Sequence, residues 1–451
     1  MTNIIERVFR AYDVRGVYGE EITGDVAEVI GKAFGTYLGP EKSIVVGRDV
    51  RLSGELLQNA LTEGLLSTGC NVIDIGILPT PIFYFSIIHY KADGGVVVTA
   101  SHNPAEWNGF KFCLERGAML AEGLGLEKVK AIALTKRFRS GRRGRVERRR
   151  DAVRVYSDFV LGMISVERRL KVAIDTGNGA CSVIVSRLFR KAGVDVIAMN
   201  DEPDGRFPAH KPEPTEETLR DLMKVVVEEG ADFGIGYDGD GDRAIFIDDR
   251  GRMVPGDLAL IIMARHYLKD RPGTVVYDIS CSMAVEESIR AMGGRPLVSR
   301  VGRAYLTDTI RQENAVLGGE LSGHLYFADV YGFDDAIYGG LKMAEFLSKT
   351  DESLSQVVDS IPKYPAIPNR RYECPDELKF KVVAQLAEEF ARMGYKTITI
   401  DGVKVVDPEG WFLIRASNTL PQIKMRAEAK NEKKLRELIE LAEEKIMEKI
   451  E

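Results

Sequence analysis

Short apolar runs alternate with longer amphipathic stretches along most of the chain. Runs of about five apolar, mostly β-branched residues suit strands that are buried on both faces, and the stretches between them repeat apolar residues with a helical period. The pattern predicts an α/β protein made of layered sheets and helices. The predicted strands cover residues 43–47, 71–75, 94–100, 171–175, 194–198, 232–236, 273–277, 295–299 and 315–318.

Two helices are predicted with particular clarity. Residues 433–450 form a long amphipathic stretch that closes the chain. Residues 55–68 form a second one between two predicted strands, and this spacing is typical of a helix that covers a sheet. Its predicted buried face consists of Leu56, Leu57, Ala60, Leu61, Gly64 and Leu65.

One sequence pattern recurs three times and predicts a repeated structural unit. In each copy an apolar strand leads into a loop of small, polar and acidic residues: TASHNP from Thr99, YDGDGDR from Tyr237 and GGELSGH from Gly318. Ligands bind where the strands of α/β sheets end, so we expect the three loops to face one cleft. The alternative is three unrelated turns, because such residues are common between strands.

Two segments divide the chain into candidate domains. Residues 137–151 are strongly basic and poor in apolar residues, and residues 360–371 contain three prolines, which suits a hinge. We therefore predict four domains, at residues 1–150, 151–252, 253–364 and 365–451, the last a smaller α+β unit.

Composition excludes several classes of protein. A net charge of −6 gives no general reason to expect a nucleic-acid partner, and the basic run 137–150 contains a single aromatic residue, Phe138, so a solvated loop is favoured over an RNA site. No apolar stretch approaches the roughly 20 residues of a membrane span. The five cysteines are scattered without a CxxC pair, which is typical of reduced thiols and predicts a cytoplasmic protein.

Ser101 is the candidate nucleophile. It follows a β-branched strand directly, and His102 and Asn103 add hydrogen-bonding groups beside its hydroxyl, while Pro104 favours an abrupt turn. No G-x-S-x-G sequence surrounds it, so a hydrolase is disfavoured. Taken alone, the segment is equally typical of an ordinary polar loop.

The segment Asp238-Gly-Asp-Gly-Asp-Arg243 is the candidate metal site. Three carboxylates at alternate positions supply the oxygen ligands that Mg²⁺ prefers, and the glycines between them let the backbone wrap around an ion. A calcium-binding EF-hand does not fit, because its sixth position would be Arg243 and its twelfth Asp249. A solvated acidic turn is the alternative.

Two further loops carry groups that suit a phosphorylated sugar. Glu320 and Ser322 offer acceptors and donors for sugar hydroxyls, and a plain loop is the alternative. Residues 415–419 (RASNT) combine an arginine, hydroxyls and successive backbone N–H groups, as phosphate sites do. The alternative is a strand-ending turn with a surface arginine, which would show the same sequence pattern.

Together these motifs resemble the α-D-phosphohexomutase family, in particular its phosphomannomutase/phosphoglucomutase group. The resemblance covers essentially the whole chain in order. It rests on FRAYDVRG from Phe9, VGRDVRLSG from Val46, TASHNP, WNGFK from Trp107, PDGRFPAHKPEP from Pro203, DGDGDR, GGELSGH, YGFDDAIY from Tyr331 and RASNTLP.

The resemblance implies three similar α/β domains with mixed sheets and a smaller α+β C-terminal domain around a central cleft. It implies that Ser101 carries a phosphoryl group, passes it to a sugar monophosphate and takes back the other phosphate of a bound sugar bisphosphate. Mg²⁺ would be held by Ser101, Asp238, Asp240 and Asp242. The predicted catalytic residues are Ser101, His102, Lys111 and Arg243, and the predicted substrate-binding residues are Tyr12, Arg15, Arg48, Arg303, Glu320, Ser322, Arg415, Ser417, Asn418 and Thr419.

The chain departs from the family pattern on the sugar side of the site. Ser280 stands where relatives have a lysine, Arg303 where a histidine is frequent, and Leu420 where a glutamate is frequent. We therefore expect a mannose or glucose 1- and 6-phosphate mutase. The alternatives are a phosphopentomutase, a phosphoglucosamine mutase, and a phosphosugar-binding protein without turnover. The expected partner is a small sugar phosphate, with no nucleic acid and no membrane, and the formation of a homo-oligomer is left open.

Overall fold

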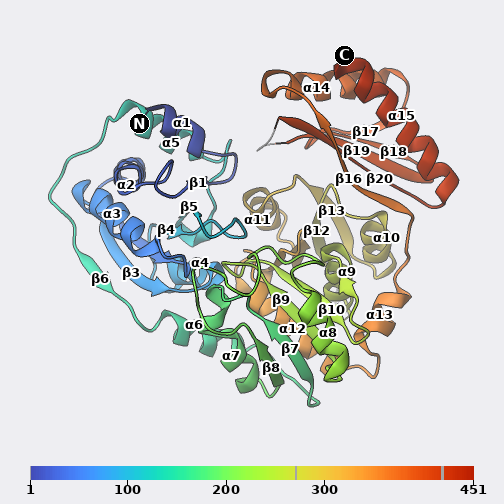
Figure 1. Cartoon of the computed structure of the whole chain (residues 1–451), viewed down its shortest axis with the longest axis horizontal. Coiled ribbons are helices and arrows are strands. Elements are labelled where there is room, and N and C mark those ends of the chain that lie inside the picture. The colour runs from blue at the N-terminus through green and yellow to red at the C-terminus, as the bar shows by residue number, and fades with distance from the viewer. Residues whose placement is uncertain (1, 270–271, 418–420, 451) are drawn as a thin grey trace.

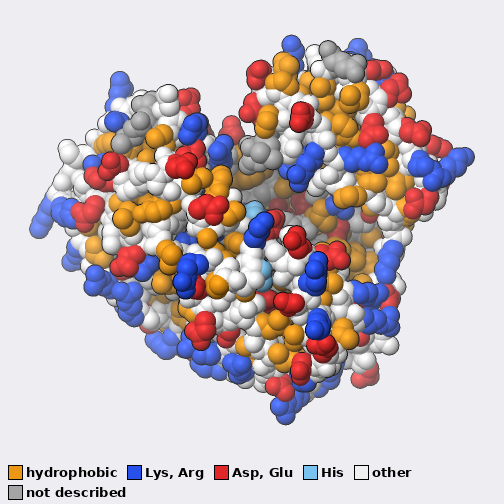
Figure 2. Space-filling view, in the orientation of Figure 1, with side chains coloured by type: hydrophobic (Ala, Val, Ile, Leu, Met, Phe, Trp, Pro, Cys, Tyr) orange, Lys and Arg blue, Asp and Glu red, His pale blue; other side chains and the backbone are white. Residues whose placement is uncertain are grey.

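The structure, a computed structural model, describes residues 2–269, 272–417 and 421–450 and contains four sheets. The chain runs from the blue domain at the left of Figure 1 through the green and yellow domains to the red domain at the upper right. Figure 2 shows a groove between the first and the last of these domains. Among the described helices, none is long and apolar enough to cross a membrane.

The first domain has a six-stranded mixed sheet with helices on its faces. Its elements are α1 (Thr2–Val8), β1 (Val14–Val17), α2 (Gly24–Leu38), β2 (Ser43–Arg48), α3 (Gly54–Ser67), β3 (Asn71–Ile77), α4 (Thr80–His89), β4 (Gly94–Val98), β5 (Trp107–Leu114), η1 (Glu115–Gly117), α5 (Leu126–Thr135) and β6 (Val146–Arg148). The strand order is β1-β5-β4-β2-β3-β6.

The second domain has a five-stranded sheet in the order β11-β10-β9-β7-β8. Its elements are α6 (Ala152–Leu161), β7 (Lys171–Asp175), η2 (Ala180–Val183), α7 (Val185–Lys191), β8 (Asp195–Met199), α8 (Arg220–Glu228), β9 (Phe233–Tyr237), β10 (Ala244–Asp248) and β11 (Met253–Val254).

The third domain has a four-stranded sheet in the order β13-β12-β14-β15. Its elements are α9 (Gly256–Tyr267), β12 (Thr274–Asp278), α10 (Met283–Ala291), β13 (Arg295–Ser299), α11 (Arg303–Gln312), β14 (Leu317–Gly319), β15 (Leu325–Phe327), η3 (Ala328–Val330), α12 (Ala336–Ser348) and α13 (Leu354–Ser360).

The fourth domain is an antiparallel sheet in the order β16-β20-β19-β18-β17, with two helices packed on it. Its elements are β16 (Ala366–Glu373), α14 (Asp376–Arg392), β17 (Lys396–Ile398), β18 (Val403–Asp407), β19 (Gly410–Ala416), β20 (Gln422–Ala429) and α15 (Glu432–Ile450).

A four-strand unit is common to the first three sheets. The orders β3-β2-β4-β5, β8-β7-β9-β10 and β13-β12-β14-β15 correspond: in each, the first three strands are parallel and the fourth is antiparallel to the third. The three loops predicted to share a cleft all connect the third strand of the unit to the fourth. The predicted repeat and the mixed sheets are therefore confirmed.

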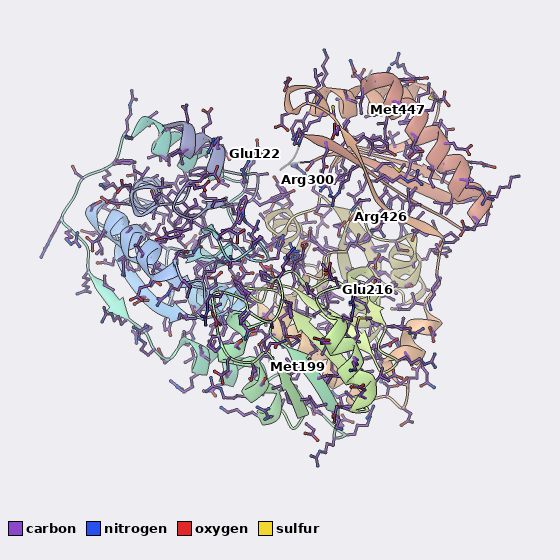
Figure 3. All side chains as sticks on the ribbon, in the orientation of Figure 1. Glu122, Met199, Glu216, Arg300, Arg426 and Met447 are labelled. Atoms are coloured by element: carbon purple, nitrogen blue, oxygen red, sulfur yellow. The ribbon has the colours of Figure 1, made fainter. Side chains whose placement is uncertain are left out.

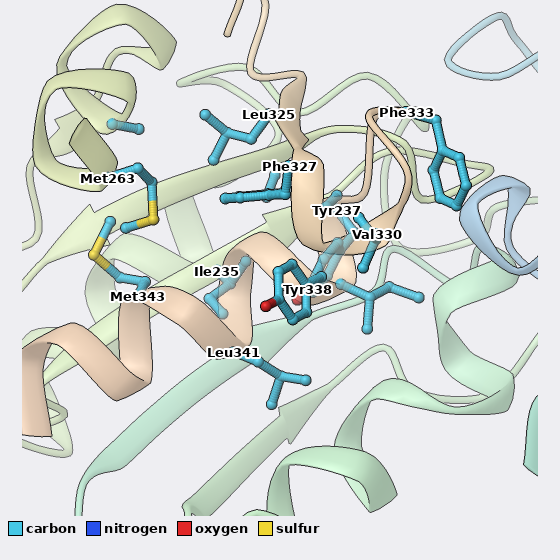
Figure 4. Packing of buried hydrophobic residues seen from close by; sticks show 14 of the residues in the cluster. Ile235, Tyr237, Met263, Leu325, Phe327, Val330, Phe333, Tyr338, Leu341 and Met343 are labelled. Atoms are coloured by element: carbon cyan, nitrogen blue, oxygen red, sulfur yellow. The ribbon is translucent and has the colours of Figure 1, made fainter. Parts of the chain in front are cut away.

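The first three domains share one continuous hydrophobic core. Val97, Phe233 and Val275, from three different sheets, belong to the same buried cluster. Figure 4 shows how α12 joins the second and third domains: Tyr338 and Leu341 lie beside Ile235 of β9. The close approach requires Gly340, where a Cβ atom would lie 2.7 Å from the Tyr237 hydroxyl.

The fourth domain has its own core, which includes Phe390, Phe412 and Ile439. It meets the third domain through a smaller cluster in which Trp411 and Leu413 pack on Ile279. The fourth domain is therefore joined to the others by a limited contact surface, whereas the first three are packed as one body.

Most predicted elements are confirmed, and the differences have local causes. The strand predicted to reach Ala100 ends at Val98, because the Thr99 hydroxyl accepts a hydrogen bond from the Ser101 amide and starts the loop. Leu56 was expected on the buried face of α3, but it is 50% exposed, because the face is set by Leu57, Leu61 and Leu65.

Both predicted linkers contain a strand. Residues 146–148 form β6 at the edge of the first sheet, where charged side chains discourage pairing with another chain. Figure 2 shows Lys and Arg side chains along the margin where Figure 1 places β6. Residues 366–371 belong to β16, an edge strand whose register shifts between Ile367 and Arg370, and this irregularity accommodates Pro368.

Candidate active site

The three equivalent loops line one cavity of about 480 Å³. Ser101 comes from the β4–β5 loop, Asp242 from the β9–β10 loop and Ser322 from the β14–β15 loop. The expectation that these loops face one cleft is confirmed. Figure 3 labels Glu122 and Arg300 near the groove between the first and fourth domains, where the Tyr305 hydroxyl donates to the Glu122 carbonyl.

Ser101 is buried and held in a strained conformation. Its φ of 52° lies in the left-handed region, which costs a non-glycine residue roughly 1 kcal/mol or more. Its hydroxyl donates to Asp238 Oδ2 at 2.9 Å and lies 3.2 Å from His102 Nδ1. The strained backbone thus presents the hydroxyl to the acidic loop of the next domain.

Asp238, Asp240 and Asp242 converge as the sequence predicted. All three are buried, and one carboxylate oxygen from each lies within 4.8 Å of the other two. Gly239 permits this arrangement, because a Cβ atom there would lie 2.5 Å from the Ser101 carbonyl oxygen. Lys111 Nζ donates to Asp240 Oδ2 at 2.6 Å and to Asp242 Oδ2 at 2.5 Å.

Two carboxylate oxygens of the acidic cluster lack a hydrogen-bond donor among the described residues. Asp240 Oδ1 and Asp242 Oδ1 are buried and accept no hydrogen bond from the described residues, although His324 Nε2 lies 3.3 Å from the latter. Burial, together with the carboxylates of Asp242 and Asp240, raises the pKa of Asp238 well above its ordinary range. Orphaned oxygens in a trio of buried carboxylates fit a small divalent cation.

Lys111 and His324 stabilise the ionised forms of the other two carboxylates. Burial acts to raise the pKa of Asp242, but Lys111 and then His324 outweigh it and hold that pKa well below the usual value. Burial and Asp242 likewise oppose ionisation of Asp240, yet Lys111 keeps its pKa below the usual value. Both groups are therefore carboxylates at neutral pH.

His102 and Arg243 lie beside the nucleophile. Both line the cavity, and the positive charge of Arg243, followed by burial, lowers the pKa of His102 well below its ordinary value. His102 is therefore neutral at pH 7. Arg243 Nε lies 3.4 Å from His324 Nε2.

Two of the three residues predicted from the first domain to bind substrate line the cavity. Arg15 donates to Asp13 at 2.8 Å and to the Asn103 side chain at 2.7 Å, and the Tyr12 hydroxyl donates to the Val301 carbonyl at 3.2 Å. Burial raises the pKa of Tyr12 to about 12.

Arg48 is placed differently. It is the last residue of β2, and its guanidinium donates to Gln58 of α3 at 2.8 Å. It is not among the described residues that line the cavity. The structure therefore directs Arg48 toward a helix rather than toward the reacting groups.

Arg303 joins three domains at the cavity wall. Its guanidinium donates to the Tyr84 hydroxyl at 2.8 Å, and it lies 3.4 Å from Asp242 Oδ2 and 3.6 Å from Asp13 Oδ2. It therefore stands beside the acidic cluster, on the side of the nucleophile.

The β14–β15 loop contains a buried network that sequence analysis identified only in part. Glu320 accepts hydrogen bonds from the Gly302 amide at 2.8 Å and the Tyr326 hydroxyl at 2.7 Å, and the Ser322 hydroxyl lies 2.8 Å from His324 Nδ1. Burial acts to lower the pKa of His324, but Asp242 and then Glu320 outweigh it and raise that pKa to about 9.

His324 was not predicted as a site residue, although it closes the motif GGELSGH that the sequence singled out. Asp334, from YGFDDAIY, was also missed. It is fully buried 3.9 Å from His324 Nε2, and burial raises its pKa to about 6. Both residues lie in motifs that carry the family resemblance, and this was the signal that could have identified them.

The predicted distal-phosphate residues belong to the fourth domain. Arg415 pairs with Asp401 at 2.6 Å, and Ser417 is buried. Neither is among the described residues that line the 480 Å³ cavity. Asn418 and Thr419, with Leu420, lie outside the described residues. Ser280, at the family's lysine position, donates through both its amide and its hydroxyl to Asp278.

Family models match the chain in four consecutive segments. They describe phosphoglucomutase/phosphomannomutase alpha/beta/alpha domain I at residues 6–140, domain II at 154–251, domain III at 255–364 and the C-terminal domain at 371–445.

Relatives match nearly the full chain. A phosphoglucomutase/phosphomannomutase of Thermococcus kodakarensis is 39% identical over 96% of this chain and 97% of its own. A probable phosphoglucosamine mutase of Methanopyrus kandleri is 35% identical over 96% of each chain.

Solved structures share the fold. A phosphoglucomutase/phosphomannomutase family protein of Burkholderia thailandensis superposes with a TM-score of 0.91 at 32% identity, covering 98% of this chain and 97% of its own. N-acetylphosphoglucosamine mutase of Aspergillus fumigatus, solved with GlcNAc-6P and magnesium, superposes with a TM-score of 0.60 at 14% identity, covering 100% of this chain and 98% of its own.

Proposed function

The chain belongs to the phosphoglucomutase/phosphomannomutase family, and we propose on this basis that it interconverts hexose 1-phosphates and 6-phosphates through a phosphorylated Ser101. The observation that carries the proposal is the contact between the Ser101 hydroxyl and Asp238, 2.9 Å apart, at the edge of three convergent carboxylates. The enzyme is an intramolecular phosphotransferase, and glucose and mannose phosphates are its expected substrates.

Asp238, Asp240 and Asp242, together with an oxygen on Ser101, would hold Mg²⁺. The orphaned oxygens Asp240 Oδ1 and Asp242 Oδ1 fit this ligand set. A bound Mg²⁺ would neutralise charge on the transferring phosphoryl group and polarise it toward attack.

The cations of the cavity neutralise the phosphate oxygens that Ser101 carries during transfer. Lys111, Arg15 and Arg243 line the cavity together with Ser101. Phosphoryl transfer depends mainly on such electrostatic stabilisation and on holding donor and acceptor in line, because little covalent rearrangement is asked of the protein.

Of the predicted catalytic residues His102 and Lys111, His102 is the better candidate for the general base. A base must have a free lone pair to take the proton of the attacking sugar hydroxyl. Lys111 donates to two carboxylates and is therefore an ammonium group without a lone pair. His102 is neutral and lies beside Ser101. His324, cationic between Asp242 and Glu320, can supply a proton or a hydrogen bond on the sugar side.

The second half of the reaction requires the bound bisphosphate to present its other phosphate to Ser101. Arg415 and Ser417, with Asn418 and Thr419, would hold the phosphate that is not reacting, and Glu320 and Ser322 would hold sugar hydroxyls. Arg415 must then exchange part of its pairing with Asp401 for the phosphate.

Substituting Ser101→Ala tests the proposal directly. We expect hexose phosphate interconversion to fall by more than about 10⁴-fold, because the variant lacks the hydroxyl proposed to carry the phosphoryl group. Hexose 6-phosphate binding, measured by calorimetry, and the circular dichroism spectrum should stay near those of the wild type. Ser140→Ala, at an exposed position, is the matched control. Normal turnover by Ser101→Ala would require another nucleophile and would refute the proposal.

Glucosamine phosphate is a second candidate substrate. The Methanopyrus relative named a probable phosphoglucosamine mutase is 35% identical, close to the value for the Thermococcus enzyme. A panel of glucose, mannose, glucosamine and ribose phosphates, each primed with its bisphosphate, distinguishes these sugars by kcat/KM. Rates for glucosamine phosphate above those for both hexoses would reassign the substrate without changing the chemistry.

A further inference from the structure

A buried arginine outside the cavity holds the loop that carries the nucleophile. Arg51 follows β2, and its side chain is fully buried. Its guanidinium donates to the Ser101 carbonyl at 2.9 Å, the Asn103 carbonyl at 2.6 Å and the Trp107 carbonyl at 3.0 Å, and also to the Pro104 carbonyl. One side chain therefore satisfies four backbone acceptors of the loop 101–107.

These four hydrogen bonds take the place of the backbone hydrogen bonds that the same carbonyls would form in a sheet. A buried carbonyl without a donor costs free energy, so the loop would rearrange if the guanidinium were removed. The guanidinium suits the task because its five N–H groups form a rigid, planar fork, which the single ammonium group of lysine cannot reproduce.

Asp49 keeps the arginine in place. Its carboxylate accepts from Arg51 Nε at 3.1 Å and from the Arg51 amide at 2.9 Å. Both side chains are fully buried, so each supplies the counter-charge that the other needs. The pair forms a fixed anchor at the carboxyl end of β2.

Residues of the second domain cover the Asp49–Arg51 pair. The Phe207 ring covers the Arg51 guanidinium at 5.1 Å, and Phe207, Val50 and Ala105 belong to one small apolar cluster. Gly205 packs against the segment that carries Arg51, since a Cβ atom there would lie 2.3 Å from the Val50 carbonyl oxygen. The conformation of the nucleophile loop therefore depends on contact with the domain that carries the acidic cluster.

We propose that Arg51, covered by Phe207, is a positioning residue that fixes loop 101–107 so that the Ser101 hydroxyl points at the acidic loop. Arg51 is not among the described residues that line the cavity, and it acts through the backbone of Ser101. The left-handed φ of Ser101 is the conformation that needs such support. This inference rests on the proposed role of Ser101 in phosphoryl transfer.

The test compares Arg51→Lys with the wild type. We expect kcat for hexose phosphate interconversion to fall about 100-fold, since misplacing a reacting group by about 1 Å costs that much, while KM changes by less than about threefold. Single-turnover transfer of labelled phosphate from Ser101 to hexose phosphate should slow by the same factor. Arg252→Lys, which alters a similar Asp- and carbonyl-bound arginine away from the cavity, should leave kcat unchanged.

Chemical rescue separates positioning from stability. Millimolar guanidinium should raise the kcat of Arg51→Ala at least about tenfold above its value without guanidinium. Sodium chloride at equal ionic strength should not raise it. If both Arg51 variants fail to fold, Phe207→Leu provides the test. We expect its kcat to fall three- to tenfold while its circular dichroism spectrum stays that of the wild type.

An unchanged kcat in folded Arg51→Lys, or in Phe207→Leu when the Arg51 variants do not fold, would overturn the inference. So would absence of guanidinium rescue in folded Arg51→Ala. A wild-type enzyme without mutase activity would instead refute the proposed function, so the two failures are distinguishable.

Discussion

The two ends of the proposed reaction path are built in different ways. At the nucleophile, Ser101, Lys111 and Asp242 are buried and held by contacts among three domains that share one core. At the distal end, Arg415 sits in a domain with its own core and a small apolar contact to the rest. The groups that must align the phosphoryl are packed among three domains, whereas those at the distal end belong to one domain with a small apolar contact to the rest.

The same contrast separates the two arginines nearest each end. Arg303 is fixed by Tyr84, Asp242 and Asp13 from other domains. Among the described residues, Arg415 forms one ion pair, with Asp401 of its own domain. A group that must release a phosphate during each cycle benefits from few competing partners, and a group that supports a metal site benefits from many.

Among the variants that compare the two ends, the largest effect is expected at the nucleophile. Asp240→Asn removes one proposed metal ligand and should lower kcat by about 10³-fold and raise the Mg²⁺ concentration needed for activity. Titration of activity against Mg²⁺ measures both effects, with Asp158→Asn as an exposed control. Wild-type activity and Mg²⁺ dependence in Asp240→Asn would remove the carboxylate trio from the mechanism.

Separate cores predict separate unfolding. Phe246→Ala in the shared core and Phe412→Ala in the fourth domain should each cost about 3–5 kcal/mol, as large-to-small core changes do. In differential scanning calorimetry each should lower one of two transitions and leave the other near its wild-type temperature. If both variants shifted a single common transition, the independence of the fourth domain would be contradicted.

Lys404 provides a pH-dependent test of the junction. It is buried between the third and fourth domains, donates to the Ile279 carbonyl at 2.9 Å and lies 3.8 Å from the Trp411 ring centre. The ring favours the charged form, but burial outweighs it and lowers the pKa of Lys404 to about 8.

Because the unfolded chain binds this proton more tightly, charged Lys404 destabilises the folded state below pH 8. That cost disappears as the pH rises from about 8 to 10.5. Relative to Lys404→Met, the free energy of unfolding of the wild type should therefore rise by up to about 3 kcal/mol across this window. Denaturant titrations at pH 7, 9 and 10.5 measure it, and a constant difference would contradict a shifted lysine.

The smallest effect is expected at the distal end. Arg415→Ala should raise KM for hexose phosphates about 10- to 100-fold with little change in kcat, because it removes a charge-assisted hydrogen bond to a phosphate that does not react. Arg392→Ala, at an exposed position of the same domain, is the control. A loss confined to kcat would place Arg415 at the chemistry instead.

Much of this organisation could be predicted from the sequence. Buried strands are short apolar runs, and the loops that follow them carry Ser101, Asp238 and Glu320, so the repeat and its common cleft followed from periodicity alone. The family resemblance added the roles of individual residues. Each predicted strand corresponds to an observed one because short apolar runs leave a strong signal, but β4 ends at Val98 and β1 and β5 were not predicted.

Side-chain direction could not be predicted in the same way. Arg48 and Arg51 occur in one motif, yet the first turns to Gln58 and the second to the nucleophile loop. Which arginine supports Ser101 depends on contacts with residues 50 or more positions away. His324 was missed for the same reason, because its charge is set by Asp242 of another domain.

The threefold repeat has a consequence for any fragment of this protein. Each unit contributes its loop from the same topological position, but none of the three loops contains a complete set of reacting groups. A chain cut between residues 150 and 151 would separate the hydroxyl from all three of its acidic neighbours. Catalysis therefore requires the three domains together, and an isolated domain is expected to have no catalytic activity.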